Sequence, residues 1–255
     1  MKVFSLVASS LAIASAATCK PTGYPTTKVG GIEVIDTPIV RDARKIVEKF
    51  TPYLYKHVMR TWLFGAAILN HNATLKAEVD VEVHAIATLL HDLGWDMTPG
   101  SPWVTTTRRF EIDGALGAKK FVTSHRDAKQ FDAWRLENLQ DGIRLHGSFD
   151  LEIGKPATVQ HIVTSIHLDN PKVPYPISNK ELNSIFAAFP NFDIAAGANE
   201  TFVWMATIKP EVTYGTIIEQ FGAAWVPGYN ATGHHAFDSI TNAILTNTSW
   251  VPRPE

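Results

Sequence analysis

The chain has little of what marks a disulfide-stabilised, nucleic-acid-binding or membrane protein. Its single cysteine, Cys19, has no partner within the chain, so the core and any bound metal must supply the stability. The formal net charge is only −2, and no basic run or alternation of basic and aromatic residues occurs, which argues against a nucleic-acid partner. No apolar run is long enough to span a bilayer, and we find no repeat. A small molecule is therefore the expected partner; the sequence leaves the oligomeric state open.

The amino terminus is typical of a secreted protein. Lys2 is followed by an uncharged, largely apolar stretch to Ala17, and Ala14-Ser15-Ala16 resembles a cleavage site. We therefore expect residues 1–17 to be a signal peptide and the mature chain to be extracellular. Four Asn-x-Ser/Thr sequons agree with export, and N-glycans are expected on some of them: Asn72, Asn199, Asn230 and Asn247.

Residues 18–255 are predicted to form a single all-α domain. Apolar periodicity predicts helices at about 39–50, 52–70, 74–92, 106–124, 132–146, 156–168, 179–188, 199–208, 213–222 and 234–246. The Pro-rich segment Lys172–Pro176 separates a core of about 41–171 from a C-terminal helical part of about 178–250. This second part is rich in Trp and Phe, so we expect it to pack on the core.

A His-Asp pair ends one apolar run, in Leu89-Leu90-His91-Asp92-Leu93-Gly94-Trp95. Such a pair is compatible with an ordinary helix end whose Asp is solvated. It is also compatible with a divalent-metal site, because imidazole and carboxylate suit Zn, Fe or Mn.

Two further polar residues continue apolar helical stripes. His57 shares a face with Leu54 and Thr61, and it could be either an inward metal ligand or a satisfied core histidine. Asp169 follows Ile162 and Ile166 at helical spacing, and a carboxylate on such a face must be paired, protonated or metal-bound. Local capping of the helix end is the other interpretation of Asp169.

In this order, the set His57, His91-Asp92 and Asp169 resembles the HD superfamily of metal-dependent hydrolases, over about residues 41–171. The chain is most similar to the fungal cyanamide hydratase-like branch, on these positions: His57 with Arg60, Leu89-Leu90-His91-Asp92, Phe110-Glu111 before Gly114-Ala115, Arg144-Leu145-His146 and Asp169-Asn170. The resemblance implies an HD-domain helical bundle. It also implies one divalent ion held by His57, His91, Asp92 and Asp169, with zinc the expected metal and iron or manganese the alternatives.

A metal held in this way acidifies a bound water and polarises a substrate atom, which allows attack on the carbon of a C≡N group or on phosphorus. HD phosphohydrolases commonly carry Lys three residues after the Asp, where this chain has Trp95. A bulky indole favours a small, dry pocket, so we expect a hydro-lyase that hydrates a small C≡N compound such as cyanamide. Two alternatives stay open: a phosphohydrolase acting on a nucleotide or phosphomonoester, whose phosphate Arg60, Arg108 and Arg109 could reach, and a non-catalytic metalloprotein.

Several other residues are candidates for the same site. Asp92 with His146 or Glu111 could transfer protons, and Trp95, Arg60 and His235 could line the substrate pocket. The spacing also resembles that of dinuclear HD enzymes, in which His125 and His146 would bind a second metal. His125 lies in a polar segment and could instead be a surface residue. His146 precedes Gly147 and could instead mark an ordinary helix end.

Overall fold

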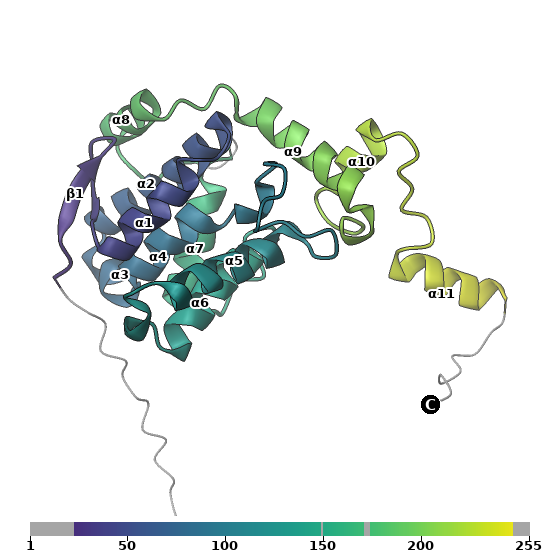
Figure 1. Cartoon of the computed structure of the whole chain (residues 1–255), viewed down its shortest axis with the longest axis horizontal. Coiled ribbons are helices and arrows are strands. Elements are labelled where there is room, and N and C mark those ends of the chain that lie inside the picture. The colour runs from purple at the N-terminus through teal and green to yellow at the C-terminus, as the bar shows by residue number, and fades with distance from the viewer. Residues whose placement is uncertain (1–22, 149, 171–173, 247–255) are drawn as a thin grey trace, which may run out of the picture.

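Helices make up almost all regular structure of the computed structural model, which describes residues 23–148, 150–170 and 174–246. Its α-helices are α1 (Pro38–Val47), α2 (Pro52–His71), α3 (Ala73–Glu78), α4 (Val81–Leu90), α5 (Phe110–Ser124), α6 (Ala133–Leu145), α7 (Ala157–His167), α8 (Asn179–Ala188), α9 (Ile194–Ile208), α10 (Glu219–Trp225) and α11 (Ala236–Leu245). The predicted all-α class is confirmed (Figure 1). Within the described ranges, no helix is both long and apolar enough to cross a bilayer.

The first regular structure is a β-hairpin that the helical periodicity did not predict. Strands β1 (Thr26–Val29) and β2 (Ile32–Ile35) pair antiparallel, with Thr27 opposite Val34. Gly30 and Gly31 form the two-residue turn at φ values of 53° and 80°, which suit a hairpin and favour glycine. β2 packs on α2 and α8, so the hairpin covers one edge of the helical body.

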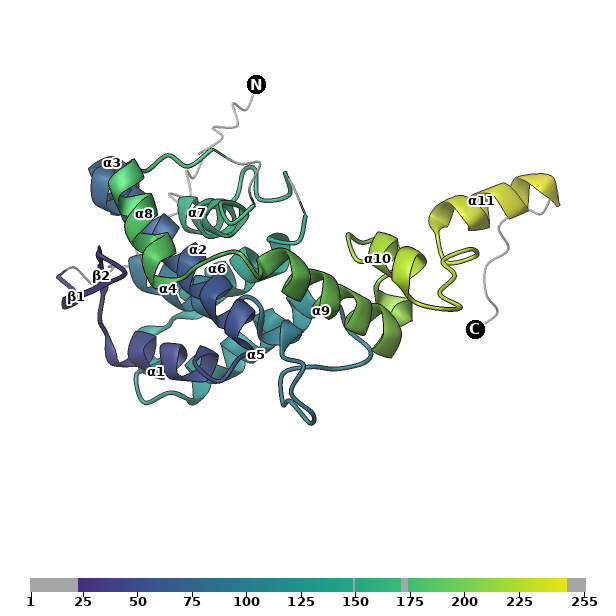
Figure 2. The same ribbon diagram turned by 90° about the horizontal axis from the view of Figure 1, so that it is seen from above.

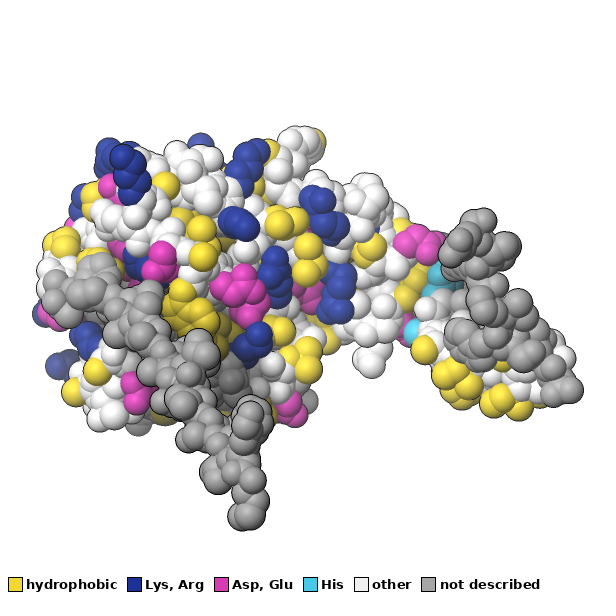
Figure 3. Space-filling model, turned by 90° about the horizontal axis from the view of Figure 1, so that it is seen from below, with side chains coloured by type: hydrophobic (Ala, Val, Ile, Leu, Met, Phe, Trp, Pro, Cys, Tyr) yellow, Lys and Arg dark blue, Asp and Glu magenta, His cyan; other side chains and the backbone are white. Residues whose placement is uncertain are grey.

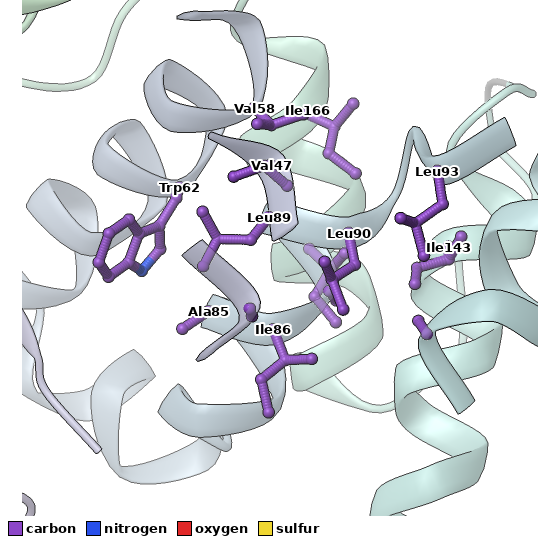
Figure 4. Close-up of a cluster of buried hydrophobic side chains, with 14 of the residues drawn as sticks. Val47, Val58, Trp62, Ala85, Ile86, Leu89, Leu90, Leu93, Ile143 and Ile166 are labelled. Carbon is purple, nitrogen blue, oxygen red and sulfur yellow. The ribbon is translucent and has the colours of Figure 1, made fainter. Parts of the chain in front are cut away.

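Helix α4 lies at the centre of the bundle. All its residues except Val81 are buried, because α1, α2, α6 and α7 surround it. Figure 4 shows Ile86, Leu89 and Leu90 of α4 between Trp62 on one side and Ile143 on the other. A helix with so many apolar residues is stable only when enclosed in this way. Its end at Leu90 places the next residue, His91, inside the molecule.

The predicted single helix 74–92 is two helices, α3 and α4, because Asp80 starts a new one. The Asp80 side chain accepts hydrogen bonds from the backbone N–H groups of Glu82 and Val83 and so caps α4. The same carboxylate forms an ion pair with buried Arg135 of α6, at 2.7 Å. A capping residue with a distant partner therefore breaks a pattern that is continuous in the sequence.

The C-terminal part packs on the core only in its first half. α8 and α9 both contact α2, whereas α10 packs on α9 and α11 extends away from the body as an arm (Figures 1 and 2). α11 has no buried residue, and Figure 3 shows hydrophobic side chains gathered on the arm. The exposed large hydrophobic residues of α11 are Phe237, Ile240, Ile244 and Leu245. We expected the C-terminal part to pack on the core; α8 and α9 do so, whereas α11 does not.

Acid is expected to destabilise the protein through His161 of α7. Burial lowers the pKa of His161 from 6.5 to about 4, so the unfolded state takes up this proton first. Above about pH 6.5, His161 is neutral in both states and does not reduce stability. As the pH falls from 6.5 through 4, the free energy of unfolding decreases by about 3 kcal/mol in total, because the unfolded state binds this proton more readily. His161→Gln keeps an N–H donor for the carbonyl of Gly65 but cannot titrate, so its stability should fall less steeply.

Urea unfolding between pH 7 and 4 measures this slope. His71→Gln, at an exposed position of α2, is the matched control and should retain the wild-type slope. Equal slopes for His161→Gln and the wild type would contradict the assignment.

Candidate metal centre

Three buried ligand atoms converge where α4 ends against α2. Nε2 of His57 lies 3.1 Å from Nε2 of His91 and 3.3 Å from Oδ2 of Asp92, and Nε2 of His91 lies 3.1 Å from the same Oδ2. Each residue offers one atom that could bind a metal ion. The three side chains come from two segments of the chain, which α2 and the end of α4 bring together.

A hydrogen bond at Nδ1 of each imidazole orients its Nε2 toward the other ligand atoms. Nδ1 of His91 donates to the carbonyl of Thr88 at 2.8 Å, and Nδ1 of His57 donates to Oδ2 of Asp169 at 2.7 Å. In the neutral imidazole the Nε2 lone pair is then free to ligate. This backing is the arrangement expected of metal-binding histidines.

The electrostatics of the group favour a cation. Both carboxylate oxygens of Asp92 are buried and have no hydrogen-bond partner, which is costly unless positive charge compensates them. Burial alone raises the pKa of Asp92, but the neighbouring histidines hold it well below its usual range. Burial likewise lowers the pKa of His57, yet the carboxylate of Asp169, which accepts a hydrogen bond from Nδ1, and the nearby charge of Asp92 raise it to about 9. With two imidazole nitrogens and one carboxylate, the donor set fits a divalent transition metal.

Asp169, predicted as the fourth ligand, lies behind His57 and outside the group of converging atoms. Its carboxylate accepts from Nε and Nη2 of Arg60, at 2.7 and 2.6 Å, besides Nδ1 of His57. The stripe on α7 predicted that Asp169 faces inward, but it could not show that a buried arginine on α2 would meet it. The structure places Asp169 as the residue that orients His57.

Arg60 is a structural cation in this arrangement. Its side chain is fully buried, and besides the bidentate contact with Asp169, Nη1 donates to the carbonyls of Phe189 and Pro190. The guanidinium thus joins α2, the segment after α7 and the segment after α8. The role predicted for Arg60, lining the substrate pocket, is not the one its contacts indicate.

Trp95 and His146 lie beside His57 and Asp92, respectively. The Trp95 ring stacks on His57 at 5.9 Å and 8°, and its buried Nε1–H has no hydrogen-bond partner. Nδ1 of His146 donates to the carbonyl of Ile143 at 2.6 Å, which leaves Nε2 3.5 Å from Oδ1 of Asp92. Nε2 of His146 therefore faces the carboxylate of Asp92.

Glu111 is buried at the start of α5. Its Oε1 accepts from Arg109 at 2.8 Å, while Oε2 has no hydrogen-bond partner. The carboxylate lies directly against Gly147, the residue after His146. Glu111 is thus a neighbour of the His146 segment rather than of the converging atoms themselves.

Two candidates lie elsewhere. His125 follows the end of α5, about 20 Å along the helix from Phe110, and its Nε2 pairs with Asp42 of α1 at 3.1 Å. His235 starts α11 and pairs with Glu219 at 2.8 Å. The structure does not bring His125 together with His146 as a second metal site, or His235 to the pocket. In both cases the linear motif carried no information on where the helix end would point.

Sequence reasoning missed the contribution of α9. Phe202 packs edge-on against Trp95 at 5.0 Å, and Thr201 is hydrogen-bonded to the hydroxyl of Tyr53, which precedes His57 by one helical turn. Helical spacing from His57 was the available signal for Tyr53. Nothing in the local sequence indicated Thr201 or Phe202, because their approach depends on the packing of a later helix.

Of the predicted sequons, Asn72 and Asn230 are exposed and Asn199 is half-buried in α9. Asn247, Cys19 and the predicted signal peptide at 1–17 lie outside the described residues.

No protein-family model matches the chain, and a search of curated proteins finds no significant match. The HD resemblance therefore rests on the residues alone.

Proposed function

We propose that the chain is a metal-dependent enzyme of the HD type that hydrates a small, neutral C≡N compound, with cyanamide as the reference substrate. One observation carries the proposal. Two imidazole Nε2 atoms, whose rings are oriented by hydrogen bonds at Nδ1, converge in a buried site with a carboxylate that has no hydrogen-bond partner. His57, His91 and Asp92 would hold the ion, and zinc is the metal we propose, with iron or manganese as alternatives. When bound, the ion supplies Lewis acidity toward water and substrate.

The remaining steps fall to side chains of the chain itself. Thr88 and Asp169 fix the orientation of the two imidazoles, so the site is organised before substrate enters. Nε2 of His146, 3.5 Å from Oδ1 of Asp92, is positioned to exchange a proton with that carboxylate. Glu111 lies against Gly147, the next residue of the same segment, and would help to hold His146 in place.

The walls of the site support an uncharged substrate. Trp95, stacked on His57 and packed against Phe202, excludes water from one side. Arg60, one of the three arginines that the sequence offered for a phosphate, is committed to Asp169 and two carbonyls. These two features favour hydration of a nitrile-type carbon over phosphoester hydrolysis. We also propose, from the amino-terminal sequence, that the protein is exported.

Metal analysis with a paired assay tests the proposal. Purified protein should contain about one equivalent of a divalent metal, and it should form urea from cyanamide. Chelation should abolish this activity and the metal should restore it. Turnover of a chromogenic phosphomonoester without any turnover of cyanamide or another nitrile would identify a phosphohydrolase, and metal content without either activity would leave a non-catalytic metalloprotein.

A further inference from the structure

The first turn of α5 meets the segment after α4 backbone to backbone, with a glycine on each side of the contact. A Cβ on Gly114 of α5 would collide with the carbonyl oxygen of His91. Reciprocally, a Cβ on Gly94 would collide with the carbonyl oxygen of Phe110, the first residue of α5. Both distances would be under 3.0 Å, closer than real Cβ atoms approach any other atom. The two segments can lie this close because neither position carries a side chain.

The carbonyl that Gly114 faces belongs to the peptide unit that joins His91 to Asp92. A peptide unit is planar, and it contains the Cα atoms of both residues. Its orientation therefore decides how the two side chains lie relative to each other. Nε2 of His91 and Oδ2 of Asp92 are 3.1 Å apart in the candidate metal centre. A rotation of this peptide plane would change the separation of these two ligand atoms.

The hydrogen bonds of the centre fix His91 but not Asp92. Nδ1 of His91 donates to the carbonyl of Thr88, which ties the imidazole to α4. The carboxylate of Asp92 has no comparable anchor, because neither of its oxygens has a hydrogen-bond partner. Its position depends on packing and on the backbone that precedes it, and Gly114 is in contact with that backbone.

We propose that Gly114 is a positioning residue of the metal centre. By admitting the carbonyl of His91 against α5, it fixes the angle at which His91 and Asp92 present their ligand atoms to a divalent ion. This inference rests on the metal centre of the proposed function and is independent of the reaction. A side chain at Gly114 would have to displace the carbonyl by about 1 Å to restore an ordinary contact. Ligands must be held within about 0.5 Å of the productive geometry, so such a displacement is large enough to weaken binding.

Gly114→Ala tests the contact directly. The Kd for zinc, measured by competition with a chelator of known affinity, should rise at least about 10-fold over that of the wild type. Urea unfolding of the metal-free protein measures stability separately. Alanine is the better helix former, which offsets part of the cost of the collision, so zinc affinity should fall more than stability does. A zinc Kd equal to that of the wild type overturns the inference.

Gly117→Ala is the matched control, one turn further along α5. Its Cβ would also collide, at 2.8 Å, but with Cδ1 of Leu93, the movable end of a side chain. The two variants share the gain in helix propensity and a collision with the same segment, and they differ in whether backbone has to move. Gly117→Ala should retain the wild-type Kd for zinc. An equal loss of affinity in both variants would show that any enlargement of α5 disturbs the centre, which contradicts a specific role of Gly114.

Cobalt(II) in place of zinc gives a readout that a loss of stability alone does not change. Its visible absorption bands depend on the number and geometry of the ligands. At saturating cobalt, Gly114→Ala should show altered bands, whereas Gly117→Ala should show those of the wild type. Wild-type bands in Gly114→Ala would mean that the ligands keep their geometry, which overturns the inference.

Two further outcomes are distinguishable. If Gly114→Ala does not fold, Gly94→Ala enlarges the other side of the same contact. A wild-type zinc Kd and wild-type cobalt bands in that variant overturn the inference. If the wild type binds zinc but hydrates no nitrile, the proposed reaction fails, and the comparison of Gly114→Ala with Gly117→Ala still decides the role of Gly114.

Discussion

Asp92→Asn is expected to abolish stoichiometric metal binding and, with it, activity. Asparagine retains the shape of the side chain, so the fold should persist, but it removes the anionic oxygen that converges with the two Nε2 atoms. Loss of this charge from a buried three-atom group leaves only neutral donors for a divalent cation. Metal content by mass spectrometry should fall from about one equivalent per chain to the background of a chelated sample.

Asp169→Asn provides the contrast. Because Asp169 binds Nδ1 of His57 and lies outside the converging group, the change should weaken metal affinity about 10- to 100-fold without eliminating it. Competition with a chelator of known affinity measures the difference, and circular dichroism checks the fold of both variants. If Asp169→Asn loses metal as completely as Asp92→Asn does, Asp169 is a direct ligand, as its sequence position implies. Full metal retention by Asp92→Asn would show that His57, His91 and Asp92 do not form the metal site.

The second large effect is expected from Arg60→Met. This change leaves the carboxylate of Asp169 buried without its bidentate partner, which should cost about 3–5 kcal/mol in the free energy of unfolding. Burial raises the pKa of Asp169, and hydrogen bonds from His57 and Arg60 at present hold it below its usual value. Without Arg60, we expect that pKa to rise and the stability to fall most at neutral pH.

Urea unfolding of two comparison variants isolates the buried charge. The double variant Arg60→Met/Asp169→Leu should recover much of the stability, because both members of the pair become apolar. Arg41→Met breaks an exposed pair with Asp36 and should change stability by about 0.5 kcal/mol or less. A loss below about 1 kcal/mol for Arg60→Met would show that the buried pair contributes little.

Periodicity predicted most helices because a stripe of apolar residues has few other ways to be buried. It also predicted that His57 and Asp169 face inward, which the burial of both confirms. What it could not predict is which inward side chains meet. Asp169 contacts Arg60, 109 residues away, and Tyr53 contacts Thr201, 148 residues away. Such contacts depend on how helices dock, and no local pattern encodes the docking.

The errors have the same origin. His125 and His235 both lie at helix ends, where the direction of the next segment decides what a side chain meets. The hairpin at Gly30-Gly31 did have a local signal, two glycines between alternating apolar residues.

The position of His91 at the end of α4 has an electrostatic consequence for metal affinity. The peptide dipoles of a helix leave partial negative charge, equivalent to about half an electron, at its C-terminal end. α4 is buried along almost its whole length, so water screens this charge poorly. A cation between His57, His91 and Asp92 therefore lies in the field of the backbone as well as that of the ligands. The same three side chains grafted at the end of an exposed helix should bind a metal ion more weakly, because part of the attraction comes from where α4 lies in the fold.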